Sequence, residues 1–420
     1  MTPTPDHRPP EPSAPPDPVA PRPRRERIGR PALVSVSLVV VLFALTMVAV
    51  FADRAGKPSA DSSPTVQPGV GSTPSAATNE GPSGSATVGP TIDVPATIDP
   101  TGTSDVTAAL QGVLDRAPDG TTIVFEHGAT YRVDGTLRLE RRTALTIDGR
   151  GATLHPTTVA DYERRTWSLI DSTNLVFRDM GIVGAHPNGG TYVPSHEHEH
   201  GFGIQGGGLV TIERVRISDV YGDCVYVAAD DSGLWADGVR FVDSFCAATG
   251  RNGVAVVAGR NVEVARTSFT KIALFPFDVE PNKTSYVEGA SVASFHDNRI
   301  TAPIGDYLVA ANGWGPVDGL SVADNLVTGT PFLLTVHPLD GSGYRRTNIT
   351  ITDNRSDTVA IGSGPVMDFA DNDRLTVTGN IQPLRDGGVF AQVIGSCIVS
   401  VSGNTVDNGT EAVIEPAACP

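Results

Sequence analysis

Basic residues are scarce in this chain of 420 residues, which has 31 Lys and Arg against 47 Asp and Glu and a net charge of −16. Six of the basic and four of the acidic residues precede residue 32, so the rest of the chain carries a charge near −18. Such a surface repels phosphate backbones and anionic lipids, which argues against a protein that binds DNA or RNA. It also argues against a polyanionic glycan as ligand, unless a cation bridges the two.

Cysteine is rarer still, with four residues, and no nucleophilic serine motif, redox dithiol pattern or kinase signature is present. The four cysteines, Cys224, Cys246, Cys397 and Cys419, form two sequential pairs that are each 22 residues apart. Four cysteines allow three connectivities. In a solenoid, however, this separation is about one turn, and neighbouring turns lie about 5 Å apart, within disulfide reach. On an exported chain we therefore favour the disulfides Cys224–Cys246 and Cys397–Cys419.

Long apolar runs are almost absent, and the exception covers residues 32–52. These 21 residues carry no charge, and a helix rising about 1.5 Å per residue would cross the hydrocarbon of a bilayer. Residues 1–31 are rich in arginine, which predicts that they form a disordered cytoplasmic tail. Residues 32–52 would then be a single-pass signal anchor in the cell membrane, with the rest of the chain outside. The alternative is a cleaved signal peptide, which would leave the protein secreted.

The 33 prolines are concentrated in the first hundred residues, and the chain changes character after them. Residues 53–97 are rich in Ser, Pro, Gly and Thr and lack apolar periodicity, which predicts a flexible linker. At the start of residues 98–416, Val106, Leu110 and Leu114 recur with helical spacing. One amphipathic helix placed before a series of strands is typical of the end cap of a β-solenoid.

A repeat of short strands fills residues 98–416. Segments such as "LVTIERVRISDV", "NITITDNRSDT" and "RLTVTGNIQPL" recur every 24 to 35 residues, each with alternating apolar positions, a polar turn and a second short strand. In the later segments an asparagine occupies the same turn, at intervals of 24 to 29 residues. Side chains that hydrogen-bond from one turn to the next explain why one residue type is kept there. These asparagines are Asn298, Asn325, Asn354, Asn380 and Asn404.

The opening "SDVTAALQ", followed by "GATYRVDGTLRL", resembles the start of the right-handed parallel β-helices of the pectate-lyase superfamily. The resemblance covers residues 98–416 and implies an all-β solenoid with an N-terminal capping helix, preceded by the membrane helix and the linker. The strings "VYGDCVYV", "GRNGVAVV" and "FDVEPN" are similar to bacterial β-helix repeat proteins. The Asn-Thr-Asp and Arg-Ile-Lys signatures of polygalacturonases are absent, as is the calcium-ligand series of pectate lyases. The resemblance therefore implies a fold and no particular reaction.

Two carboxylates, separated by one residue, stand in the predicted strand "FPFDVEPN". If Phe277 and Val279 point into the coil, Asp278 and Glu280 both point outward, with Cα atoms about 6.6–7 Å apart. This spacing is near the lower end of the range for inverting glycosidases. Two carboxylates at that distance also push their pKa values apart, so that one holds a proton while the other does not. We predict that they are the catalytic acid and base, in either order; two solvated surface charges are the alternative.

Neighbouring turns of the solenoid add polar groups to the same outer face. Strand alternation places Tyr226 in the outward column of Glu280 and puts Asp223 at the preceding turn, where we expect it to assist catalysis. Other residues of these turns, and one farther along the groove, are expected to bind the substrate. The predicted substrate-binding residues are His200, Tyr226, Arg251, Asn252, Asn282 and His337.

The string "SHEHEHG" is the most unusual local sequence. His196, His198 and His200 would share one face of an extended segment and form a feasible metal-ligand set. Glu197 and Glu199 would be the calcium-binding alternative. Neither set has the ligand spacing of a known metal-binding family, so we predict no metal and no other cofactor. A divalent cation stays an unsupported alternative.

Together these features predict a membrane-anchored, extracytoplasmic β-helix that acts on polysaccharide of a cell envelope or capsule, most simply as a glycoside hydrolase. A polysaccharide lyase or uronate epimerase is the first alternative, in which Arg251 or His200 would abstract a proton. A non-catalytic glycan-binding or structural surface protein is the second. The sequence leaves open the sugar, the linkage and whether the domain forms homotrimers.

Overall fold

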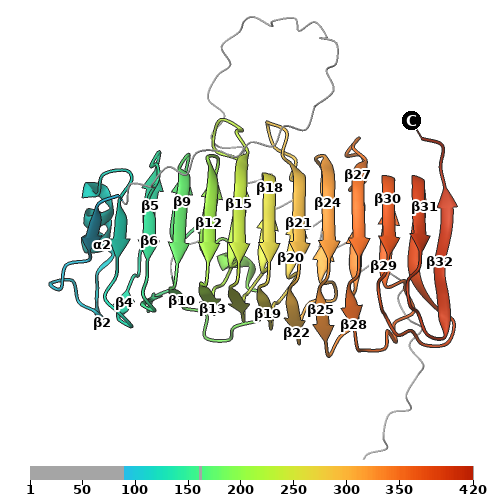
Figure 1. The fold of residues 1–420 in the computed structure, drawn as a ribbon, viewed down its shortest axis with the longest axis horizontal. Helices are drawn as coiled ribbons and strands as arrows, with labels where there is room; N and C mark the ends of the chain where they lie inside the picture. The colour runs from blue at the N-terminus through green and yellow to red at the C-terminus, as the bar shows by residue number, and fades with distance from the viewer. Residues whose placement is uncertain (1–88, 160–162, 420) are drawn as a thin grey trace, which may run out of the picture. The chain divides into compact units, whose positions relative to one another are not determined.

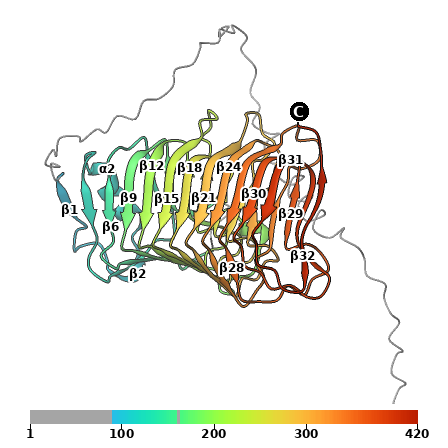
Figure 2. The ribbon, with the colours of Figure 1, turned by 45° about the vertical axis from the view of Figure 1, so that its right-hand side comes forward.

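The computed structural model describes residues 89–159 and 163–419, which wind into a coil with three parallel β faces (Figures 1 and 2). The parallel β-solenoid predicted from the repeat is confirmed. The predicted tail 1–31, the predicted anchor 32–52 and most of the predicted linker 53–97 lie outside the described residues. Within the described part of the chain, no helix is long and apolar enough to cross a membrane.

Each strand pairs in parallel with the equivalent strands of the turns before and after it. The first face contains β1 (Thr91–Asp93), β3 (Thr122–Val124), β6 (Thr146–Asp148), β9 (Thr173–Arg178), β12 (Gly208–Glu213), β15 (Ala236–Val242), β18 (Ala258–Ala265), β21 (Gly289–His296), β24 (Val317–Ala323), β27 (Arg346–Thr352) and β30 (Asn372–Thr378). The second face contains β2 (Thr101–Asp105), β4 (Thr130–Arg132), β7 (Thr153–His155), β10 (Gly181–Val183), β13 (Arg216–Ser218), β16 (Phe245–Ala247), β19 (Ser268–Thr270), β22 (Arg299–Thr301), β25 (Leu326–Thr328) and β28 (Arg355–Ser356). The third face contains β5 (Leu137–Glu140), β8 (Arg165–Ile170), β11 (His200–Gln205), β14 (Val225–Ala228), β17 (Val254–Val256), β20 (Phe277–Val279), β23 (Val309–Ala310), β26 (Leu334–Val336) and β29 (Met367–Ala370).

The two ends of the coil differ. Helix α2 (Thr107–Arg116) lies at the first end (Figure 1) and buries Leu110, Val113 and Leu114, as expected of a cap. At the other end, β31 (Gly388–Ser402) runs through both the third and the first face, and β32 (Gly409–Pro416) pairs with it.

The solenoid begins earlier than predicted. Strand β1 pairs with β3, with Thr91 opposite Thr122, although residues 91–93 fall within the range 53–97 that we predicted as linker. The apolar residue Ile92 packs against the core of the coil. Strand β1 is too short to show an apolar period, so its pairing could not be predicted from the sequence.

The core is built by columns of apolar side chains that repeat once per turn. On the third face, Val225, Val254, Phe277 and Val309 are aligned in successive strands, and all are at most 1% exposed. Alternate residues of the same strands point outward. The inward direction predicted for Phe277 and Val279 is therefore confirmed, and Asp278 faces out of the coil.

The asparagine stack between the first and second faces is present as predicted. The backbone N–H of each of the first four asparagines donates to the side-chain oxygen of the asparagine one turn later, at 3.0 to 3.2 Å. The residue before Asn325 and that before Asn354 are aspartates with φ of 55° and 56°, a conformation that Asp tolerates better than most residues. The turn is thus specified by its side-chain chemistry, and Asn298, Asn325, Asn354 and Asn380 are buried.

Both predicted disulfides are also present. Cys224 is bonded to Cys246 and Cys397 to Cys419, with Cα atoms 6.2 and 5.4 Å apart. The second bond ties the segment after β32 back to β31. Cysteine spacing close to one turn was therefore a valid guide to pairing.

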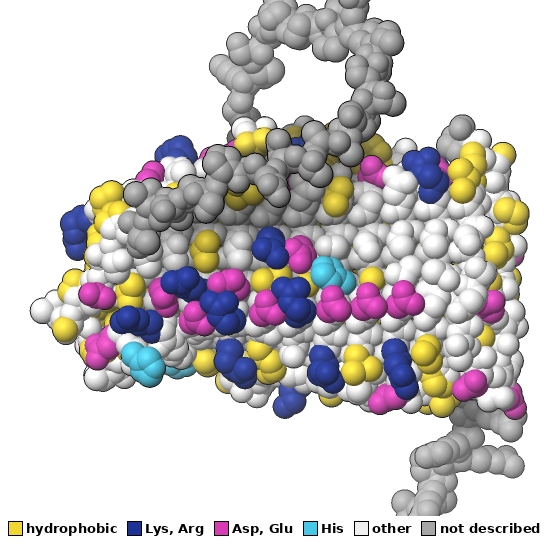
Figure 3. Space-filling view, in the orientation of Figure 1, with side chains coloured by type: hydrophobic (Ala, Val, Ile, Leu, Met, Phe, Trp, Pro, Cys, Tyr) yellow, Lys and Arg dark blue, Asp and Glu magenta, His cyan; other side chains and the backbone are white. Residues whose placement is uncertain are grey.

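Charged side chains cross the first face in bands of both signs (Figure 3). Arg240 and Glu263 are opposite each other on β15 and β18 and form an ion pair of 2.6 Å. Arg266 and Asp243 pair at 2.8 Å on a neighbouring turn. These side chains are largely solvated, so each pair contributes little stability.

Candidate functional site

The third face carries a cluster of charged side chains over β11, β14, β17 and β20 and the turns that precede these strands. Asp278 is in the middle of β20, yet it is only 4% exposed. Glu280 follows the strand, and 22% of its side chain is accessible. The two carboxylates thus share the outer face, one nearly covered and the other open to solvent.

Arg251 joins the acidic groups of the cluster. Its Nη1 donates to Asp223 Oδ2 at 2.9 Å, and its Nη2 donates to Glu280 Oε1. The residues it connects come from turns far apart in sequence. Nearby carboxylates raise the pKa of Arg251 well above its ordinary value although burial opposes them. The guanidinium is therefore permanently charged.

Asn252 connects the other half of the cluster. Its Nδ2 donates to Asp278 Oδ2 at 3.1 Å, and its backbone N–H donates to Asp223 Oδ1 at 2.8 Å. Its own Oδ1 accepts the N–H of Phe275 at 3.2 Å. Since Asn252 is completely buried, its amide has a fixed orientation that presents a donor to Asp278.

Burial controls the protonation of the acids. Burial raises the pKa of Asp278 well above its ordinary value, and the neighbouring Glu280 raises it further while Arg251 opposes the rise. Burial likewise raises the pKa of Asp223 to about 7, against the effect of Arg251. The environment of Asp278 therefore favours its protonated form, the form that a general acid requires.

His200 lies behind these acids and stacks on Tyr226, with ring centroids 4.7 Å apart and an angle of 2° between the rings. Its Nδ1 accepts the backbone N–H of Asp223 at 3.0 Å, so its proton is on Nε2. Burial lowers the pKa of His200 well below its ordinary value, and Arg165 lowers it further. His200 is thus a neutral, buried residue that supports Tyr226 and Asp223.

The position of Tyr226 corrects one detail of the register. Strand β14 pairs with β17 and β17 with β20 so that Tyr226, Ala255 and Asp278 are aligned. The tyrosine therefore stands in the column of Asp278, and not in that of Glu280 as predicted. A shift of two residues conserves the in–out alternation, so the sequence pattern does not distinguish the two registers.

The segment before β11 covers the cluster and contributes residues that we did not predict as part of it. Tyr192 Oη donates to Glu197 Oε2 at 2.7 Å, and this carboxylate is 3.8 Å from Arg251 Nε. Burial raises the pKa of Glu197. Glu197 belongs to the unusual "SHEHEHG" string, which was a signal for it, whereas nothing in the sequence marks Tyr192.

The histidines of this string do not form the extended row that a metal site would require. Residues Pro194–His196 form the 3-10 helix η1, which turns the segment. His196 Nδ1 lies 3.0 Å from Glu199 Oε1, whereas His200 Nδ1 faces Asp223. Within residues 89–159 and 163–419 no group of three or more His, Cys, Asp or Glu side chains is placed to hold a metal ion.

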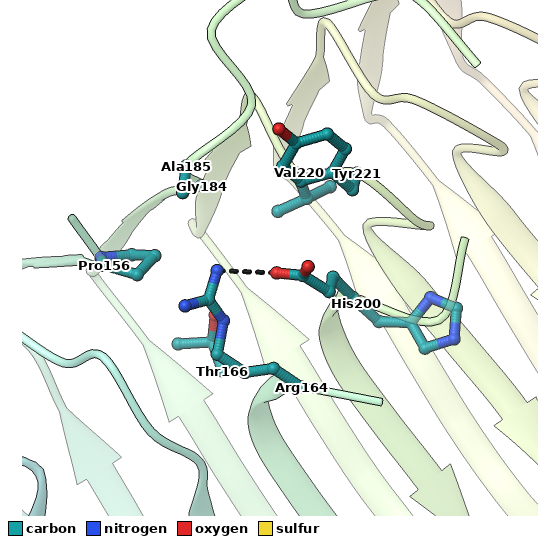
Figure 4. Close-up of a pocket in the computed structure, with 9 residues that line it drawn as sticks. Pro156, Arg164, Thr166, Gly184, Ala185, His200, Val220 and Tyr221 are labelled. Atoms are coloured by element: carbon teal, nitrogen blue, oxygen red, sulfur yellow. Dashed lines mark hydrogen bonds and ion pairs between the residues drawn. The ribbon is translucent and has the colours of Figure 1, made fainter. Parts of the chain in front are cut away.

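Beside the cluster is a small cavity of about 10 Å³, lined in part by Arg164, Glu199 and Tyr221 (Figure 4). Arg164 Nη2 donates to Glu199 Oε2 at 2.6 Å, and both side chains are buried. The volume is about that of one water molecule. This cavity cannot hold a sugar, so we regard the Arg164–Glu199 pair as support for the covering segment.

The remaining two predicted residues lie away from the acids or act through the backbone. Asn282 is close to the cluster, but its described contact is the backbone N–H, which donates to Glu288 Oε2 at 2.7 Å. His337 follows β26, two turns beyond β20, and its Nε2 is 2.6 Å from Thr335 Oγ1. His337 thus lies farther along the third face than the acids, where it was expected, and its contact with a substrate stays a prediction.

The fold is shared with proteins of known structure. PfbA, a surface adhesin of Streptococcus pneumoniae, has 13% identity and a TM-score of 0.52 over 78% of this chain and 99% of that chain. The endo-xylogalacturonan hydrolase of Aspergillus tubingensis has 14% identity and a TM-score of 0.51 over 76% of this chain and 99% of that chain.

At this identity the likeness establishes the fold alone, which is a right-handed parallel β-helix. This confirms the fold that the resemblance in the sequence implied. No protein-family model and no curated protein matches the sequence.

Proposed function

We propose that the β-helix domain hydrolyses a glycosidic bond of an extracellular polysaccharide, with Asp278 as general acid and Glu280 as general base. The observation that carries this proposal is the contrast between the two groups: Asp278 is buried and has a raised pKa, whereas Glu280 is partly exposed and paired with Arg251. The endo-xylogalacturonan hydrolase with the same fold supports the choice of substrate class.

In this mechanism the Asp278 O–H gives its proton to the glycosidic oxygen as the bond from that oxygen to the anomeric carbon breaks. Glu280 takes a proton from a water molecule, whose oxygen forms the new bond to the anomeric carbon. A water between the two carboxyl groups leads to inversion of configuration. Asn252 and Arg251 hold the two groups in place through the hydrogen bonds described above.

Asp278 is 4% exposed, so access to it requires the groups around it to move. The segment of Tyr192 and Glu197, which contacts Arg251 of the cluster, is one such group. If the segment stays closed, a polysaccharide contacts only the outer side chains. That outcome would favour the second candidate, a non-catalytic glycan-binding surface protein, and PfbA shows that a surface adhesin has this fold.

Elimination or epimerisation needs a base, and the two residues predicted for that role, Arg251 and His200, are not suited to it. Arg251 is paired with two carboxylates and keeps its proton. His200 uses Nδ1 to accept a backbone N–H, and its Nε2 already carries the proton. Neither group has a lone pair free to abstract a proton from a uronate.

The test is to incubate the purified protein with neutral and acidic polysaccharides and to measure reducing ends and unsaturated-product absorbance. We expect reducing ends without absorbance, and a loss of about 10²- to 10⁴-fold in Asp278→Asn and in Glu280→Gln. Asp324→Asn, at an exposed turn of the first face, is the matched control and should keep full activity. Absorbance would indicate a lyase, and two fully active amide variants would show that the site is misplaced.

We also propose that residues 32–52 anchor the chain in the cell membrane with residues 1–31 in the cytoplasm. The support is the uncharged run of 21 residues and the arginines before it. Separation of the full-length protein into membrane and soluble fractions, before and after deletion of these residues, tests the anchor. Recovery of the intact chain in the soluble fraction would contradict it.

A further inference from the structure

A tryptophan between two glycines is held rigidly next to the acidic cluster. Trp314 lies in the segment between β23 and β24, and its backbone N–H donates to Pro281 O at 2.7 Å. Pro281 directly follows Glu280 in the chain. The tryptophan is therefore anchored to the backbone of the residue beside the proposed general base.

The two flanking glycines are required by close backbone packing. A Cβ atom on Gly313 would lie 2.6 Å from Pro281 Cδ, and one on Gly315 would lie 1.9 Å from Glu288 O. Both distances are shorter than any normal contact, so a larger residue would displace the segment. The Gly-Trp-Gly sequence thus sets Trp314 at a defined place against the chain that follows Glu280.

A buried arginine forms hydrogen bonds with the backbone of the same segment. Arg346 is 0% exposed, and its guanidinium donates to the carbonyl oxygens of Ala311, Gly313 and Gly315 at 3.1, 2.9 and 2.7 Å. All three acceptors belong to the segment that carries Trp314, and none is a carboxylate. Burying a charge against carbonyls alone is costly. The three hydrogen bonds of Arg346 fix the backbone of the Trp314 segment.

The indole itself is not part of the core. Trp314 is partly exposed, and the Lys283 ammonium lies 5.3 Å from the centroid of its ring. Lys283 is an exposed side chain in the segment after Glu280. The face of the ring is thus covered by a solvated side chain that a ligand can displace at small cost.

We propose that Trp314 is the stacking platform for an uncharged pyranose that is bound next to Glu280, in the place that Lys283 occupies over the ring. The apolar face of a sugar ring packs on an aromatic ring, while its hydroxyls reach the polar groups around it. The buried Glu288 accepts the backbone N–H of Asn282, two residues after Glu280, at 2.7 Å, so two acidic side chains lie near this segment and disfavour an acidic sugar. This inference rests on the proposed function, because it assigns a subsite to the same substrate.

Intrinsic fluorescence tests the proposal directly. In a Trp235→Phe background the remaining tryptophans are Trp314 and the fully buried Trp167. The probes are the hexasaccharides of β-1,4-glucose, β-1,4-xylose and β-1,3-glucose, with oligogalacturonate as the acidic comparison. We expect at least one uncharged probe to change the emission. If none of the uncharged probes does so, the proposal is wrong.

Variants then separate stacking from folding. Trp314→Ala should weaken binding of that probe about three- to tenfold in calorimetry, and Trp314→Phe should restore part of the affinity. Lys283→Gln should strengthen binding about two- to fivefold, because it removes the side chain that competes for the ring. Circular dichroism and the melting temperature verify that the variants are folded. An unchanged affinity in folded Trp314→Ala overturns the proposal. The proposal is also overturned if the native protein prefers oligogalacturonate and Lys283→Gln abolishes that preference.

The outcome for this subsite is distinguishable from the outcome for the proposed hydrolysis. Binding that depends on Trp314, without release of reducing ends, supports the subsite and contradicts the hydrolase. Release of reducing ends with an unchanged KM in Trp314→Ala supports the hydrolase and contradicts the subsite. Absence of both binding and turnover overturns both.

Discussion

Replacing Arg251 by methionine removes the cation that joins the acids of the cluster. In the native protein its guanidinium donates to Asp223 and to Glu280 and lies 3.8 Å from Glu197. Methionine conserves much of the apolar volume of the side chain and none of its hydrogen bonds. The change therefore isolates the electrostatic contribution of Arg251 more cleanly than alanine would.

The expected loss of unfolding free energy at pH 7.5 is about 3–5 kcal/mol, the typical result of removing one partner of a buried ion pair. Asp223 is 0% exposed, so water cannot replace the lost guanidinium. Without Arg251 the folded-state pKa of Asp223 rises further, since the arginine opposes the effect of burial. Below that pKa the carboxyl is protonated and needs no cation, so the loss should become smaller at pH 5.

Urea unfolding followed by circular dichroism at pH 5 and pH 7.5 measures both values. Arg240→Met is the matched control, because Arg240 forms an ion pair with Glu263 on the solvated first face, where the side chains are 48% and 26% exposed. Its removal should cost less than about 1 kcal/mol at either pH. A loss for Arg251→Met that is equally small, or that does not change with pH, would refute the buried network.

Two further predictions concern the acid and the asparagine stack. Asp278→Asn should gain stability relative to the native protein as the pH rises from 5 to 8. The reason is that a raised pKa makes the folded native state bind more protons than the unfolded state. A difference in melting temperature between the two proteins that stays constant across this range would contradict the raised pKa. Asn354→Ala should cost about 2–3 kcal/mol in urea unfolding, since it leaves the buried N–H of Asn325 without its acceptor. Asn404→Ala, at the less buried end of the stack, should cost less, and equal losses would argue against burial as the cause.

The fold and the composition of the site were largely accessible from the sequence. The asparagine interval, the cysteine separation and the strand alternation each repeat with the period of the coil, so they predict which residues lie on neighbouring turns. This is why Asp223, Arg251, Asn252, Asp278 and Glu280 could be placed in one cluster. Each of these inferences needs only the length of a turn and the direction of a side chain in a strand.

Other features depend on loops and on the directions of long side chains, which no period specifies. The cover formed by Tyr192 and Glu197 belongs to a segment of irregular backbone. The alignment of Tyr226 with Asp278 differs from the predicted one by a register shift that conserves the alternation. The sequence also could not show that Arg346 supports Trp314.

The repeating positions along the chain were sufficient to specify a coil, its stacked turns, its disulfides and the outward direction of the acids, because these follow from spacing alone. The environments of the two carboxyls, which favour a proton on Asp278, exist only in three dimensions. Asp278 and Glu280 are two residues apart and chemically similar, but one is buried beside an amide and the other is partly exposed beside a guanidinium. That difference in environment arises from residues on other turns, and it exists only once those turns are stacked.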